Sequence, residues 1–185
     1  MPIDCLHLTV LEVAHSRTKE EISSLVEIME SKIPSITDHT MKFHARLVKP
    51  TISYDAAAIA LSFLPAAGET YSGIGNIDTD TYTYHHLRRD IYAESKSTGV
   101  EIASRYVVPS SHLTIARFVT QRDFAKDEEG GMDQLKIEKL VEKIEEINGS
   151  LRTEHWSKHT EEWQVGEGKG LVCRRGTVWY GGGQS

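Results

Sequence analysis

The stretch Cys5-Leu6-His7-Leu8-Thr9-Val10-Leu11 is matched far along the chain by a second stretch, Ser111-His112-Leu113-Thr114-Ile115-Ala116-Arg117. Both contain His-Leu-Thr followed by a β-branched aliphatic residue. Leu, Thr, Val and Ile favour strands, and successive side chains of a strand point to opposite faces. Each stretch is therefore predicted to form a strand that anchors its aliphatic side chains in a core. The opposite face would then present one imidazole and one hydroxyl.

An amphipathic helix is predicted after each of these two motifs. The first begins after Thr18, a suitable N-cap, and carries apolar residues at helical spacing until it ends near Pro34. The second carries such residues from Ile137 to Ile147, and Asn148-Gly149 is predicted to stop it. The order of motif strand and helix thus occurs twice, which indicates a pseudo-repeat.

The segments between the motifs predict further strands and one more helix. Residues 41–48 alternate, with the basic side chains of Lys42, His44 and Arg46 on one face. That face is either solvated or lines a phosphate-binding cleft. The apolar run 57–64 predicts a buried strand, and residues 82–97 predict a helix. Short strands are expected at 163–165, 171–173 and 177–180.

Composition excludes several classes of protein. The chain has 185 residues, of which 39% are hydrophobic and 26% charged, which is typical of one globular domain, here expected to have two lobes. No apolar run approaches the length of a membrane span. Two cysteines without a C-x-x-C pattern indicate free thiols and a cytoplasmic or nuclear location. The net charge of −6 argues against extended nucleic-acid binding but permits a local basic pocket.

Two imidazoles that face one cleft suit concerted acid–base catalysis. One can accept a proton from water or a hydroxyl, and the other can protonate a leaving oxygen. Phosphodiester chemistry needs both transfers, together with donors that stabilise the non-bridging oxygens. Thr9 and Thr114 share a strand face with their respective histidines and can be those donors. The scheme requires no metal or other cofactor, and the pair His155 and His159 has no evident third ligand.

The paired motifs resemble those of the 2H phosphoesterase superfamily, which includes RNA 2′,3′-cyclic phosphodiesterases, also called 2′,5′ RNA ligases. The resemblance covers His7-Leu8-Thr9-Val10 and His112-Leu113-Thr114-Ile115 and extends through Ala116-Arg117 into the following helix. It implies an α+β fold with two mainly antiparallel sheets, pseudo-twofold symmetry and flanking helices around a central cleft. Residues 1–185 would form one bilobal catalytic domain without the strand and helix that precede the first motif in relatives.

The resemblance also implies roles for particular residues. His7 and His112 would be the catalytic pair, and Thr9 and Thr114 would bind phosphate. Candidate substrate-binding residues, including aromatic rings that could stack on a base, are Arg117, Tyr106, Tyr84, His44 and Trp179. The expected substrate is an RNA end with a 2′,3′-cyclic phosphate or a small cyclic nucleotide, with no membrane partner. Two alternatives stay open: a nucleotide- or RNA-end-binding module without turnover, and RNA 2′,5′ end joining.

Overall fold

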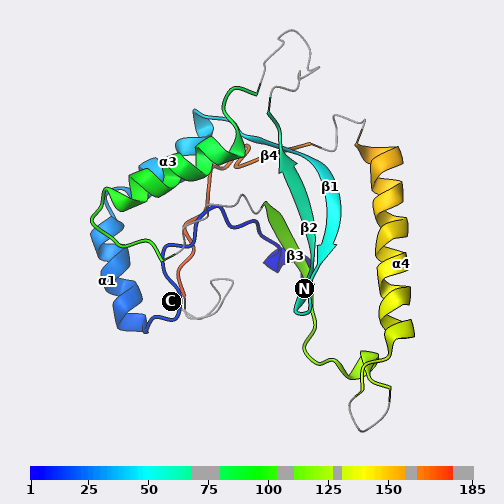
Figure 1. Cartoon of the computed structure of the whole chain (residues 1–185). Helices are drawn as coiled ribbons and strands as arrows, with labels where there is room; N and C mark the ends of the chain where they lie inside the picture. The colour runs from blue at the N-terminus through cyan, green and yellow to red at the C-terminus, as the bar shows by residue number, and fades with distance from the viewer. Residues whose placement is uncertain (68–79, 104–110, 127–130, 157–161, 177–185) are drawn as a thin grey trace. The chain divides into compact units, whose positions relative to one another are not determined.

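The chain has an α+β fold and contains a four-stranded antiparallel sheet with the strand order β3-β2-β1-β4. The computed structural model describes residues 1–67, 80–103, 111–126, 131–156 and 162–176 (Figure 1). Its longer elements are, in chain order, α1 (Lys19–Met29), α2 (Ile33–Thr37), β1 (Arg46–Tyr54), β2 (Ala58–Pro65), α3 (Tyr84–Lys96), β3 (His112–Arg117), α4 (Gln134–Ser150) and β4 (Trp163–Gln164).

The chain divides into two compact units that interleave along the sequence. The first unit comprises Met1–Leu8, Lys49–Leu64 and His112–Glu161. The second unit comprises Thr9–Val48, Pro65–Ser111 and Glu162–Ser185. His7 and Leu8 of the first motif and His112–Ile115 of the second motif lie in the first unit, whereas Thr9 and Val10 lie in the second.

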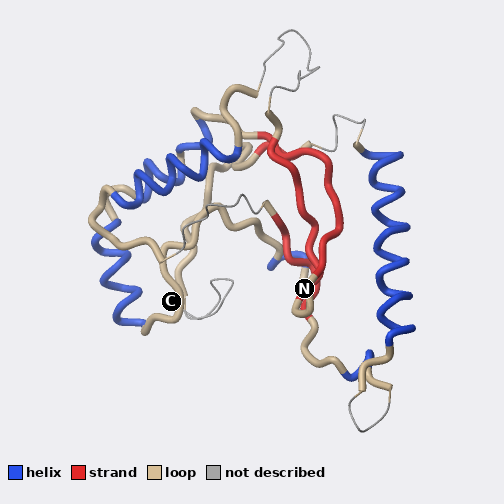
Figure 2. The backbone as a smooth tube through the Cα atoms, viewed as in Figure 1, coloured by secondary structure: helices blue, strands red, loops and turns tan. Residues whose placement is uncertain are grey.

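The first unit is built on the hairpin of β1 and β2, which curves along its length (Figure 2). Asp55 forms the turn, because its backbone N–H donates to the carbonyl of Ala58 over 3.0 Å. Strand β3 pairs antiparallel with β2, with Ala58 opposite Arg117 and Ser62 opposite His112. The register shifts between Ile59 and Ala60, which is a β-bulge in this pair.

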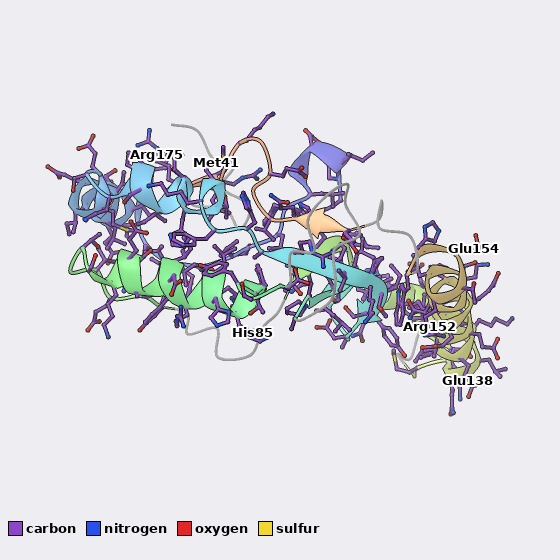
Figure 3. The ribbon with its side chains drawn as sticks, turned by 90° about the horizontal axis from the view of Figure 1, so that it is seen from above. Met41, His85, Glu138, Arg152, Glu154 and Arg175 are labelled. Atoms are coloured by element: carbon purple, nitrogen blue, oxygen red, sulfur yellow. The ribbon has the colours of Figure 1, made fainter. Side chains whose placement is uncertain are left out.

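Helix α4 runs beside the hairpin and satisfies the backbone of β1 (Figure 1). The buried Asn148 side chain accepts from the N–H of Ile52 over 2.7 Å and donates to its carbonyl over 3.0 Å. The indole N–H of Trp156 donates to the carbonyl of Pro50 over 2.9 Å. These bonds satisfy backbone groups of β1 that a neighbouring strand would otherwise satisfy. On the solvent side, Glu138 and Glu154 point away from the protein (Figure 3).

The second unit contains α1, α2 and α3. Helix α1 begins with a capping box in which Thr18 accepts from the N–H of Glu21, and the Glu21 carboxylate accepts from the N–H of Thr18. Helix α3 buries Tyr84, Leu87 and Ile91 on one face. Strand β4 pairs antiparallel with the first residues of β1, at the registers Arg46–Gln164 and Leu47–Trp163, where Leu47 is fully buried.

Several predicted elements are confirmed and others are wrong. The helices after Thr18 and over 82–97 and the strands of 57–64 and of the second motif are confirmed. The first motif forms a single bridge at Leu8 instead of a strand, and the strand predicted from residue 41 begins at Arg46 because His39–Met41 forms a 3-10 turn. Residues 171–173 form no strand, and residues 177–180 lie outside the described residues.

The described residues also bear on the predicted absence of a membrane span and on the two cysteines. None of the helices in the described ranges combines the length and hydropathy of a bilayer span. Cys5 is half-buried and Cys173 is exposed, and both are free thiols as predicted.

Candidate active site

The two motifs lie side by side in the first unit, where Leu8 and Leu113 form an antiparallel bridge. In this register His7 comes opposite Thr114. Residues directly opposite one another in an antiparallel pair project to the same side, and neighbours along each strand project to the other side. His7, Thr114 and His112 therefore share one face of the motif pair, and the two leucines occupy the opposite face. We call the face that carries His7, Thr114 and His112 the histidine face.

The imidazole of His7 is held by the backbone just before it. Its Nδ1 lies 2.8 Å from the carbonyl oxygen of Cys5 in a half-buried contact. That carbonyl belongs to a 3-10 turn, Ile3–Cys5, which is closed by the bond from the Leu6 N–H to the carbonyl of Ile3 over 3.1 Å. A carbonyl only accepts, so Nδ1 carries the hydrogen and Nε2 is the ring nitrogen that remains for proton transfer.

The second motif occupies β3, which pairs with β2. His112 is exposed and pairs with Ser62, and the half-buried Thr114 pairs with Ala60. On the β2 side, the neighbour of Thr114 is therefore the small side chain of Ala60. Ile115, the residue after Thr114, has no partner in the regular pairing and forms the bulge. The bulge bends β3 and so changes the direction of its last residues, which include Arg117.

Two serines and one aspartate extend the histidine face, and none of them was singled out in the sequence. The hydroxyl oxygens of Ser62 and Ser53 lie 2.6 Å apart. Ser62 is the only polar residue in the apolar run 57–64, and that isolation is the signal that could have identified it. Asp55 has no comparable signal, because Asp is common at turns.

Asp55 adds a negative charge at the hairpin turn. Its Oδ1 accepts from the N–H groups of Ala57 and Ala58 over 2.7 and 2.8 Å. These bonds are the main reason that the pKa of the Asp55 carboxyl is lowered, and the positive charges of Arg117 and His112 lower it further. The carboxylate thus stays ionised near the end of β3, where it faces the cationic side chains of the motif strand.

Three further predicted site residues, Thr9, Tyr84 and His44, belong to the second unit. The Tyr84 hydroxyl donates to the carbonyl of Thr9 over 3.5 Å. Tyr84 is 0% exposed, which leaves no ring face for a base and favours a packing role. The exposed His44 contacts Gln164 in the second unit, with 2.9 Å between the His44 Nδ1 and the Gln164 side-chain nitrogen.

Other site predictions fall outside the described residues. Tyr106, Trp179 and His159 are among them, so their roles stay predictions. Within the described ranges, no group of three His, Cys, Asp or Glu side chains is arranged to hold a metal ion.

No family model, curated protein or solved structure matches this chain. The groups of the histidine face are two imidazoles, a threonine hydroxyl, a pair of serine hydroxyls and the Asp55 carboxylate. Imidazoles can exchange protons near neutral pH, and hydroxyls can donate to anionic oxygens. This set is suited to moving two protons around an anionic group.

Proposed function

We propose that this chain is a 2H-type phosphoesterase that hydrolyses 2′,3′-cyclic phosphates at RNA ends or in small cyclic nucleotides. His7 and His112 are its acid–base pair. The antiparallel bridge between Leu8 and Leu113 is the observation that carries the proposal, because its register gives both imidazoles to one face. Neither histidine alone would justify the proposal.

The spacing along the bridge fits a phosphate between the two rings. His7 lies opposite Thr114, and His112 is two residues from Thr114 on the same strand. Such diagonal neighbours in a regular antiparallel ladder are about 7–8 Å apart. A phosphate held between side chains at that separation can be reached by a ring nitrogen from each side. Thr114 is opposite His7 and two residues from His112, so its hydroxyl can donate to a non-bridging oxygen of that phosphate.

The reaction proceeds by displacement at phosphorus. One imidazole takes a proton from water while the water oxygen forms a bond to phosphorus. The bond from phosphorus to one ribose oxygen breaks, and the other imidazole gives that oxygen a proton. The products are a phosphomonoester and a free ribose hydroxyl, and both imidazoles exchange their protons with solvent before the next turnover. Thr9 supplies the second phosphate donor in this proposal, on the basis of the motif alone.

The proposal includes the bilobal arrangement expected of such enzymes. Each motif is followed along the chain by an amphipathic helix, α1 after His7 and α4 after His112. This repeated order supports a pseudo-twofold relation between two lobes.

Single substitutions of the two histidines test the proposed function. His7→Ala and His112→Ala should each lower kcat on a 2′,3′-cyclic nucleotide by about 10²–10⁴-fold, because each removes one proton transfer. His85→Ala is the matched control, since His85 is exposed on α3 (Figure 3) and should leave kcat unchanged. Thermal unfolding of every variant shows whether it has kept its fold.

Two results would contradict the proposal. One is a parent protein that hydrolyses no member of a panel of cyclic mono- and oligonucleotides. The other is a double variant, His7→Ala with His112→Ala, that is as fast as the parent. Calorimetry with nucleoside monophosphates should accompany the assay, because tight binding without turnover would identify a binding module instead.

A further inference from the structure

A chain of polar contacts in the second unit joins the 3-10 turn His39–Met41 to helix α3. The ring Nε2 of His39 lies 2.9 Å from the hydroxyl oxygen of Tyr82, and that hydroxyl donates to Oδ2 of Asp90 over 3.0 Å. On the other side of the ring, Nδ1 of His39 lies 3.6 Å from Oε2 of Glu94. The side chains of His39 and Glu94 are only 14% and 25% exposed, so salt and water screen this contact only in part.

The hydrogens of this chain of contacts can be assigned. The pKa of the Asp90 carboxyl is lowered, first by its bond from Arg89, so the group is ionised and accepts the single proton of the Tyr82 hydroxyl. The Tyr82 oxygen then acts as an acceptor toward His39, and this contact requires a hydrogen on Nε2. Nδ1 is therefore the ring nitrogen that gains a proton when His39 becomes charged.

The contact of Nδ1 with Glu94 depends on the charge of the His39 ring. In the neutral ring, Nδ1 carries a lone pair, so two acceptors face one another. In the protonated ring, Nδ1 carries a hydrogen and the contact is an ion pair. The Ser35 hydroxyl of α2 donates to the other carboxylate oxygen of Glu94, and the Phe43 ring packs on the His39 ring with 4.9 Å between centroids. Within the described ranges, the titratable groups in this chain of contacts are Tyr82, Asp90 with its partner Arg89, and Glu94.

We propose that His39 forms a pH-sensitive contact between the 3-10 turn and α3, which is strong when the ring is protonated and weak when it is neutral. Histidine side chains change charge between about pH 5 and 8. The contact should therefore be strongest in acid and should be lost as pH rises through that range. Because Ser35 bonds to the same carboxylate, α2 is joined to α3 through Glu94 as well. The inference concerns the second unit alone and does not depend on the proposed phosphoesterase activity.

Urea denaturation at about pH 5.5 and about pH 8 tests the contact through the variant Glu94→Gln. The folding equilibrium constant of the parent, divided by that of Glu94→Gln, should be about two- to fivefold larger at the lower pH, as for a partly exposed ion pair. In a His39→Gln background, the same ratio should not change with pH, because the titrating partner is gone. In a His85→Gln background it should keep its full pH dependence, since His85 is exposed on the same helix. A ratio that is equal at both pH values in the parent background would overturn the inference.

Nitrogen NMR of the His39 ring tests the assignment of hydrogens in the parent protein, without relying on the folding of a variant. At about pH 8, the neutral ring should carry its hydrogen on Nε2. Tyr82→Phe removes the acceptor of that hydrogen and should move it to Nδ1, where Glu94 accepts it. Tyr92→Phe, at a half-buried position of α3, is the matched control and should leave the His39 signals unchanged. A parent ring with its hydrogen on Nδ1 would contradict the proposal, because Glu94 would then accept from the neutral ring as well.

Discussion

The polar groups of the charged cluster around Arg46, in the second unit, are buried and paired with one another. Those of the histidine face, in the first unit, are more accessible. Arg46 is 8% exposed, and its guanidinium donates to both carboxylate oxygens of Asp80 over 2.8 and 2.6 Å and to Glu162. The bond to Asp80 is the largest of the causes that raise the pKa of Arg46. On the histidine face, by contrast, His112 is exposed and Thr114 is half-buried. The charges around Arg46 are therefore paired with one another inside the protein, whereas the imidazole of His112 is accessible to a substrate.

The comparison corrects one prediction from the sequence. Alternation over 41–48 put Arg46 on a basic face that was either solvated or part of a phosphate-binding cleft. Both interpretations are wrong for Arg46, because Asp80 and Glu162 surround it, although they lie 34 and 116 residues away in the sequence. Arg88, on α3, is another buried arginine and is 4% exposed.

The largest expected effect on stability comes from Arg46→Met. It leaves two carboxylates without their cation in a poorly solvated site, which should cost about 3–5 kcal/mol of unfolding free energy. Chemical denaturation measures this, with Arg17→Met as the control because Arg17 is exposed and makes one ion pair, to Glu21. If Arg46→Met kept the stability of the parent but lost its phosphoesterase activity, Arg46 would belong to the active site. That result would contradict the contrast between the two regions.

Asn148→Ala tests whether a buried, hydrogen-bonded side chain also stabilises the first unit. The substitution leaves the N–H and carbonyl of Ile52 without their side-chain partner, so we expect a loss of about 1–3 kcal/mol. Gln134→Ala, on an exposed position of the same helix, should change the unfolding free energy by less than about 0.5 kcal/mol. Equal stability of the two variants would show that α4 does not depend on this contact.

The smallest effect is expected at a half-buried carboxylate of the second unit. The pKa of Asp90 is lowered, first by its bond from Arg89 and also by the bond from the Tyr82 hydroxyl. A lowered folded-state pKa gives stability that is present above the unfolded pKa and is lost as pH falls through the folded pKa. Asp90→Asn should therefore cost about 0.2–1 kcal/mol at neutral pH and flatten the decline of stability below about pH 4. Urea denaturation across that range measures both, and an unchanged acid limb would contradict the assignment.

Local sequence signals were reliable where short-range interactions decide structure. Thr18 as an N-cap and the helical spacing after it predicted where α1 begins, and the apolar run 57–64 predicted β2. The same reasoning failed at helix ends that tertiary contacts control. Asn148-Gly149 was expected to stop a helix that instead continues to Ser150, and the Asn148 side chain bonds to Ile52 of β1. The helix after Thr18 was predicted to end near Pro34, but α1 ends at Met29. Pro34 lies instead in the first turn of α2, where a missing N–H costs little.

The sequence by itself identified the pair of His-Leu-Thr motifs, because duplication is visible without coordinates. Only the tertiary structure decided that Leu8 lies opposite Leu113, so that His7 and His112 share a face. It also decided that the neighbours of this face are Ser62, Ser53 and Asp55, and that Tyr84 is buried. The physical reason is that strand alternation depends on adjacent residues, whereas register depends on hydrogen bonds between segments more than a hundred residues apart.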